Sequence, residues 1–161
     1  MTGAADIQAV TFGLGDETFA VPVEYVREIL DYRETFRIPN GPAWLLGLTD
    51  MRGQGVATID FRVRLGLPAT VASPATRILV VDVPLEDRAL TLGLVVDRVL
   101  EVSSLQRGAI EPAPDIGVAW PSDFIAGMIR RTEGFVVLLD IARIFSAADA
   151  GALAAPALAA A

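Results

Sequence analysis

The chain has 161 residues, a net charge of −7, and neither cysteine nor histidine. All 13 of its basic residues are arginine, so lysine is absent as well. The sequence therefore lacks thiol and imidazole nucleophiles, Schiff-base lysines, and histidine or thiolate ligands for a metal. Catalysis would depend on carboxylates, hydroxyls, tyrosine or arginine, and a metal site on oxygen ligands alone. We predict that the protein is not an enzyme, with no cofactor and no metal.

The acidic charge and the scattered arginines argue against nucleic acid as a partner. Residues 1–8 lack the basic region and apolar core of a signal peptide, and no apolar run approaches the ~18 residues of a spanning helix. We therefore expect a cytoplasmic protein with no direct membrane insertion. The apolar content of 53% predicts a well-filled core, extra apolar surface for partners, or both.

Short apolar or alternating runs between turn residues predict strands along the first half of the chain. These runs cover residues 10–14, 18–21, 44–48 and 56–59. Pro22 fits the first position of a short helix, but residues 26–30 read both as helix and as strand, so the boundary stays open. Asp60 is a predicted N-cap for a short helix over residues 61–65.

Residues 69–75 form a loop of small side chains, the best candidate boundary within the chain. The second half predicts strands over residues 77–83, 89–96, 124–130 and 135–139. Pro112 and Pro114 mark a long loop, and Asp140 is predicted to cap a final helix that ends at Phe145. The alanine-rich residues 147–161 are set apart as a tail, which leaves one domain over residues 8–146.

The second half of the chain echoes the first. Gly47 precedes Asp60 by 13 positions (60 − 47), and Gly127 precedes Asp140 by 13 (140 − 127). Each span reads as a strand, an arginine-bearing turn, a second strand, an aspartate and a short arginine-bearing helix. Such self-similarity predicts two related units, each too small to bury its sheet well alone.

A second match, between residues 23–29 and 96–102, places Glu28 and Glu101 at equivalent positions. Both glutamates are either outward-facing positions on half-buried elements or polar rims around apolar patches. The patches would be formed by Val26 in one unit and by Val99 and Val102 in the other. The many short strands favour a pair of small β-barrels over a parallel sheet.

Arg52 and Gly53 lie at a predicted turn. Arg52 is either a solvated turn residue or a planar donor fork offered to a partner's carboxylate or carbonyl oxygens. We predict that it projects and pairs with a partner rather than bracing its own barrel, whereas Arg62 lies on a solvated helix face. Gly47 either relieves crowding within a strand or lets a partner's backbone approach closely.

Two other pairs of residues have mainly structural interpretations. Asp60 and Asp140 are predicted helix caps, and they would form the catalytic pair of a hydrolase only if they faced each other roughly 5–10 Å apart. Trp44 and Trp120 are predicted to plug the barrels, with partner anchoring at a barrel mouth as the alternative.

The order and spacing of these motifs, from about residue 10 to residue 145, resemble the CheW family of bacterial chemotaxis adaptors. The motifs that carry the resemblance are the V-x-E-I element at 26–29, residues 47–53 followed by Asp60, residues 93–97 with Val99 and Val102, I-x-P-x-P from 110, and residues 137–140.

The resemblance implies an all-β fold of two intertwined, five-stranded, SH3-like β-barrel subdomains with short connecting helices and a C-terminal helix. It also implies a non-enzymatic adaptor at membrane-associated receptor arrays. Its partners would be the regulatory domain of a chemotaxis histidine kinase and the cytoplasmic tip of methyl-accepting chemoreceptors. By motif, the partner contacts fall on Val26, Glu28, Gly47, Arg52, Gly53, Val99 and Val102.

The sequence departs from the family pattern around the turn. Asp50 and Met51 stand where asparagine and leucine are usual, Gly55 replaces an aliphatic residue, and Ala57 replaces a proline. A regulatory module of a non-flagellar chemosensory pathway is therefore an alternative function.

Overall fold

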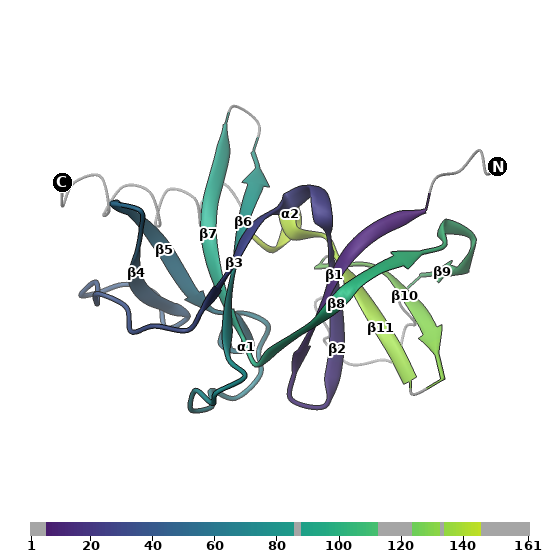
Figure 1. Ribbon diagram of the computed structural model, residues 1–161, viewed down its shortest axis with the longest axis horizontal. Coiled ribbons are helices and arrows are strands. Elements are labelled where there is room, and N and C mark those ends of the chain that lie inside the picture. The colour runs from purple at the N-terminus through teal and green to yellow at the C-terminus, as the bar shows by residue number, and fades with distance from the viewer. Residues whose placement is uncertain (1–5, 86–87, 113–123, 133, 146–161) are drawn as a thin grey trace.

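The computed structural model describes residues 6–85, 88–112, 124–132 and 134–145. Its strands form two sheets, which lie side by side in Figure 1. The six-stranded sheet has the order β8-β1-β2-β11-β10-β9, and the five-stranded sheet has the order β3-β6-β7-β5-β4. The expected all-β class is thus confirmed. Trp120, Pro114 and the alanine-rich tail lie outside the described residues.

The six-stranded sheet contains β1 (Ile7–Leu14), β2 (Glu17–Pro22), β8 (Arg98–Leu105), β9 (Ile110–Glu111), β10 (Ile125–Arg131) and β11 (Gly134–Leu139). The five-stranded sheet contains β3 (Val26–Asp31), β4 (Leu45–Met51), β5 (Gln54–Asp60), β6 (Arg77–Pro84) and β7 (Ala89–Val96). The helices are η1 (Val23–Tyr25), α1 (Phe61–Arg64), η2 (Arg107–Ala109) and α2 (Ile141–Ile144).

The expectation of five strands in each unit is wrong for the sheet that contains β9. This strand has only two residues and pairs with β10 through Ile110 and Glu111. A segment this short shows no alternation of apolar and polar residues, and Pro112, which lacks a backbone N–H, follows it directly. The sequence pattern therefore predicts only a loop for this segment.

The two sheets are built from two repeats that exchange strands. The hairpin β1-β2 pairs in parallel with β11, just as the hairpin β6-β7 pairs in parallel with β5. Each repeat therefore places its first two strands in one sheet and its last three long strands in the other. This strand exchange explains why neither of the two similar halves of the sequence forms one sheet by itself.

The strand registers fix which residues of the two repeats correspond. Val26 faces Val81 and Val99 faces Phe12, and a bulge follows each valine before the ladder resumes at Glu28 and Glu101. The same kind of irregularity precedes Gly47 in β4 and Gly127 in β10. Glu28 and Glu101 therefore occupy equivalent positions in the structure as well as in the sequence, and so do Gly47 and Gly127.

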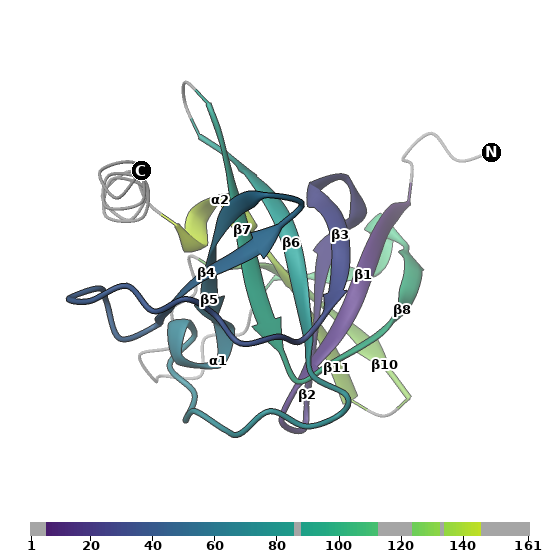
Figure 2. The same cartoon turned by 60° about the vertical axis from the view of Figure 1, so that its left-hand side comes forward.

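The largest apolar cluster draws on both sheets and on α1 and α2. The two helices lie between the sheets in Figure 1 and to the left of β6 and β7 in Figure 2. Phe12 is fully buried in this cluster and packs with its ring centroid 5.9 Å from those of Phe19 and Phe61. Each sheet also encloses a smaller cluster on its opposite face. One comprises Ala9, Ala20, Leu105, Ile129, Val136 and Leu138, and the other Met51, Val56, Ile78 and Val80. Because each small cluster joins strands from both sides of its sheet, both sheets are curled.

The two predicted helix caps differ. The side chain of Asp60 accepts a hydrogen bond from the backbone N–H of Val63 at 3.3 Å, which confirms the first cap. Asp140 occupies the equivalent position before α2, but its side chain makes no capping bond and instead pairs with Arg143 at 3.4 Å. The open boundary after Pro22 is also resolved, because η1 ends at Tyr25 before the strand begins.

Candidate functional site

The predicted site residues divide among three sheet edges. Val26 and Glu28 lie on edge strand β3, Gly47 lies on edge strand β4, and Arg52 and Gly53 form the turn that follows β4. Val99 and Val102 lie on β8, which is an edge strand of the other sheet. The structure therefore places the first five residues in the five-stranded sheet and the two valines of β8 in the six-stranded sheet.

Arg52 and Gly53 are the two loop residues of the β4–β5 hairpin, since Met51 pairs with Gln54. Both have positive φ angles, 54° and 84°, as a type I′ turn requires. Asp50 stabilises the turn by accepting a hydrogen bond from the Gly53 N–H at 2.9 Å. The aspartate that departs from the family pattern thus supports the turn that presents Arg52.

The Arg52 side chain projects from this turn, as expected, with 79% of its surface exposed. Its guanidinium also pairs with Glu28 of the same chain, and the expected contact with a partner stays a prediction. Nη2 donates to Oε1 at 3.1 Å, and Nη1 lies 3.1 Å from Oε2. The Glu28 side chain is only 22% exposed, so the pair is exposed on the Arg52 side alone.

Apolar side chains flank both glutamates. Val26 and Val99 are half-buried and pack against the main core. Three positions further along each strand, Ile29 is 43% exposed and Val102 is 59% exposed, and Leu100 on β8 is 47% exposed. Each edge thus presents an exposed aliphatic side chain next to a glutamate.

Gly47 is buried and accommodates a close approach from its own chain. Its φ is +147°, and a Cβ atom there would lie 2.1 Å from the backbone oxygen of Phe36. Phe36 and Leu48 exchange two backbone hydrogen bonds, each 2.8 Å long. The approach foreseen for a partner's backbone is therefore made by the segment around Phe36, whose side chain is 70% exposed.

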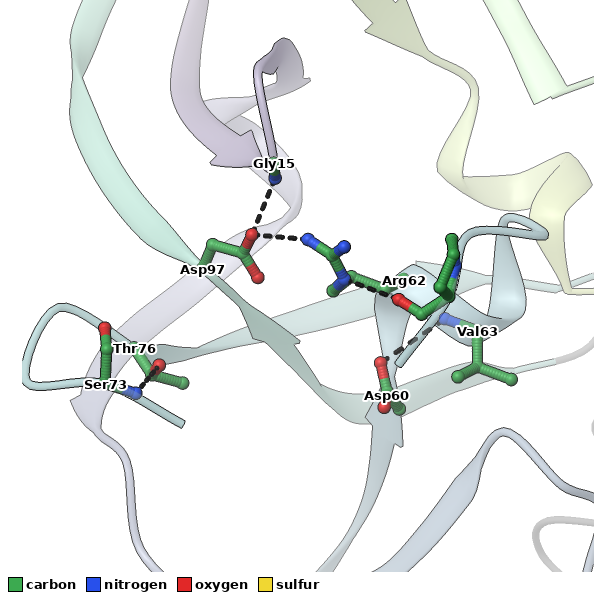
Figure 3. Close-up of polar contacts among 8 residues, drawn as sticks. Gly15, Asp60, Arg62, Val63, Ser73, Thr76 and Asp97 are labelled. Atoms are coloured by element: carbon green, nitrogen blue, oxygen red, sulfur yellow. Dashed lines mark hydrogen bonds and ion pairs between the residues drawn. The ribbon is translucent and has the colours of Figure 1, made fainter. Parts of the chain in front are cut away.

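The expectation that Arg62 lies on a solvated helix face is wrong, since only 17% of its side chain is exposed. Its Nη1 donates to Asp97 Oδ2 at 2.6 Å, and its Nε donates to the carbonyl oxygen of Pro68 at 2.7 Å. The same carboxylate oxygen accepts the Gly15 N–H at 2.6 Å, so Asp97 joins α1 to the β1–β2 turn of the other sheet (Figure 3).

A second arginine on α1 also crosses between the sheets, and sequence reasoning missed it. The guanidinium of Arg64 lies over three aromatic rings at 5.3–5.5 Å from their centroids: Trp44, Phe124 and Phe145. It also donates to the carbonyl oxygen of Ile144. Trp44 contributes to this cage rather than plugging a barrel alone, with its ring 6.3 Å from that of Phe145.

Among the residues that the structure describes, no group of three or more carboxylates could hold a metal ion. Burial raises the pKa of Tyr25 above its usual value, with smaller contributions from the charges of Glu24 and Asp140, so its phenol stays protonated at neutral pH. No helix in the described part of the chain is long and apolar enough to cross a membrane.

Residues 8–149 match the family model of the CheW-like domain. The chain belongs to the CheW-like domain family. It is 29% identical to the chemotaxis protein CheW of Rhizobium meliloti over 86% of each chain. It is 30% identical to CheW of Klebsiella aerogenes over 86% of this chain and 81% of that one. The resemblance inferred from the motifs is thus confirmed for this CheW-like chain.

The fold agrees with a solved CheW structure. The scaffolding protein TtCheW from Thermoanaerobacter tengcongensis matches with a TM-score of 0.77 at 24% identity, over 89% of this chain and 95% of that one. At this level of identity the match shows the shared fold. A solved CheW structure named as a scaffolding protein therefore shares the architecture described above.

Proposed function

We propose that this protein is a non-enzymatic adaptor that couples a chemotaxis histidine kinase to the cytoplasmic tips of methyl-accepting chemoreceptors. It would act in the cytoplasm, at membrane-associated receptor arrays, and bind the regulatory domain of the kinase. The observation that carries the proposal is the CheW-like family match over residues 8–149. Co-sedimentation with receptor tips and the cognate kinase tests it, and a failure to sediment with either partner would contradict it.

The geometry supports a protein with two contact surfaces. The first surface comprises Val26, Glu28, Arg52 and Gly53, with Gly47 acting indirectly by accommodating the segment around Phe36. The second surface comprises Val99 and Val102. The two surfaces lie on different sheets and have different exposed side chains. One molecule could therefore hold two different partners at the same time.

Arg52→Ala is expected to leave the unfolding midpoint nearly unchanged while weakening the binding of one partner. Exposed substitutions usually change stability by less than about 0.5 kcal/mol. Truncation of an interface arginine commonly costs ~1 kcal/mol or more, about a fivefold loss in affinity. Thermal denaturation and co-sedimentation measure the two effects. Arg143→Ala is the control, because Arg143 is 68% exposed and lies outside both proposed surfaces.

The charge-swapped double variant Arg52→Glu with Glu28→Arg separates two roles of this ion pair. If the pair only braces β3 against the turn, the swap restores binding along with the internal contact. If the Arg52 fork is offered to a partner's carboxylate, the swap leaves binding impaired, which is the expected result. Restored binding would therefore contradict the assignment of Arg52 to a partner contact.

The alternative of a non-flagellar pathway differs in the identity of the partners rather than in the mode of binding. The departures from the family pattern keep the turn intact, since Asp50 bonds Gly53 and Met51 is buried in the core of its sheet. Co-sedimentation with each kinase and receptor set of the host distinguishes the two pathways.

A further inference from the structure

The two curled sheets end differently at their mouths. The mouth of a sheet is the end where its β4–β5 or β10–β11 turn lies near the facing edge strand. In the five-stranded sheet, Arg52 of the turn pairs with Glu28 of the edge strand. In the six-stranded sheet Arg131 pairs with Gly134, so the register places Thr132 where the other sheet has Arg52. Glu101 takes the place of Glu28, but the turn supplies no arginine to meet it.

The inner lining of the two mouths also differs. Apolar side chains that fill the five-stranded mouth correspond, through the strand registers, to polar side chains in the other: Leu30, Val80 and Met51 match Ser103, Thr11 and Arg131. The apolar set packs into a buried cluster. The polar set instead lines an open cavity of about 540 Å³.

Glu101 lines this cavity and is held in place there. Its Oε2 accepts a hydrogen bond from Ser103 Oγ at 3.0 Å. Thr11 Oγ1 donates to the Glu101 carbonyl oxygen at 3.0 Å and accepts from its N–H at 3.2 Å. Among the described residues, no arginine lies within ion-pair distance of Glu101. The carboxylate is therefore oriented by its own sheet while one of its oxygens has no hydrogen-bond partner there.

The rest of the cavity suits a long cationic side chain. Asp16 and Glu17 line it together with Glu101, and Arg131 is the one cation among the described residues that line it. Two apolar side chains line it as well, Leu100 and Phe135, which are 47% and 44% exposed. An arginine stem can pack on apolar groups of this kind while its guanidinium reaches a carboxylate.

We propose that the mouth of the six-stranded sheet binds an arginine side chain presented by a partner protein, with Glu101 receiving the guanidinium as Glu28 receives Arg52. The site takes arginine rather than lysine, because a planar fork matches a carboxylate through two parallel bonds and an ammonium does not. This inference deepens the proposed function, since Val99 and Val102 lie on the same edge strand as Glu101 and the site specifies what their partner carries.

The test is a titration of isotope-labelled full-length protein, followed by NMR, with the blocked peptide acetyl-Asp-Met-Arg-Gly-Gln-amide, which copies the Arg52 turn. We expect saturable shifts of the backbone amides around Thr11, Glu101 and Ser103, and much weaker binding of the lysine version of the peptide. Glu101→Gln should weaken binding about tenfold or more, since hydrogen bonds to charged groups have this magnitude. Glu111→Gln is the matched control, because Glu111 pairs with Arg130 on β10 and does not line the cavity.

A second variant tests the site by filling it from within. Thr132→Arg should abolish peptide binding, because the new arginine lies on the turn that faces Glu101, whereas Thr132→Gln should not. Circular dichroism verifies that each variant is folded. Absence of wild-type binding, equal binding by Glu101→Gln, or undiminished binding by Thr132→Arg would each overturn the inference. Co-sedimentation with kinase and receptor is scored separately, so a failed peptide titration leaves the adaptor function standing.

Discussion

Gly47→Ala is expected to destabilise the protein by about 3 kcal/mol or more, a large part of the 5–15 kcal/mol typical of a domain. The new Cβ would lie 2.1 Å from a backbone oxygen, that of Phe36, and backbone cannot rotate away as a flexible side chain can. Relief of the clash would separate Phe36 from Leu48 and break both 2.8 Å hydrogen bonds between them. Equilibrium unfolding by urea measures the loss.

Gly134→Ala is the matched control for the backbone angle. Gly134 also has a positive φ, +133°, but a Cβ there would meet no atom within 4 Å. Its substitution should therefore show only the cost of placing an alanine in this region, about 1–2 kcal/mol. The difference between the two variants isolates the clash with Phe36. Equal losses would show that the segment around Phe36 moves freely, and the packing argument for Gly47 would then be withdrawn.

Gly127 shows that this close approach belongs to the repeat. A Cβ at Gly127 would lie 2.3 Å from Ile110 Cγ2 and 3.1 Å from the Glu111 carbonyl oxygen. Glu111 pairs with Met128 as Phe36 pairs with Leu48, one position after each glycine. Both glycines therefore admit an extra segment against an edge strand. A partner-binding defect in a Gly47 variant must be measured on the folded fraction alone.

Local patterning predicted most of the secondary structure, because hairpins and short helices depend on neighbouring residues. The strands over residues 10–14 and 18–21 and the Asp60 cap all follow from spacing within a few positions. The equal spacing that relates Gly47 to Gly127 also predicted a longer-range feature, because it reflects equal strand registers in the two repeats. What spacing could not show was that the repeats exchange strands, because pairing between distant hairpins leaves no local signal.

The contacts of the arginines could not be predicted from the sequence for the same reason. Arg52 and Glu28 were both singled out, but they are 24 positions apart and nothing local joins them. Arg62 reaches Asp97 across 35 positions, and Arg64 reaches Ile144 across 80. A four-residue helix carries too little periodicity to show which face is buried. Only the packing of α1 at the junction of the sheets decides that these two arginines point inward.

Arg62→Ala is expected to cost about 2–4 kcal/mol of stability, since removal of one member of a largely buried ion pair leaves the other without compensation. The Arg62 and Asp97 side chains are 17% and 21% exposed, so water can replace the guanidinium only in part. The substitution also removes the bond to the Pro68 carbonyl, which holds the loop after α1. Thermal and urea unfolding, followed by tryptophan fluorescence, measure the change.

Two further variants show whether the loss of stability arises from the Arg62–Asp97 ion pair that joins the two sheets. Arg143→Ala, on the equivalent helix α2, removes a pair that is 68% and 37% exposed and should cost less than about 1 kcal/mol. Arg62→Lys keeps the charge but cannot donate to Asp97 and to the Pro68 carbonyl in the same planar geometry, so it should recover only part of the stability. If Arg62→Ala and Arg143→Ala cost the same, Asp97 is satisfied by the Gly15 N–H and water alone. The link between α1 and the β1–β2 turn would then contribute little, and the apolar core at the junction would hold the two sheets together by itself.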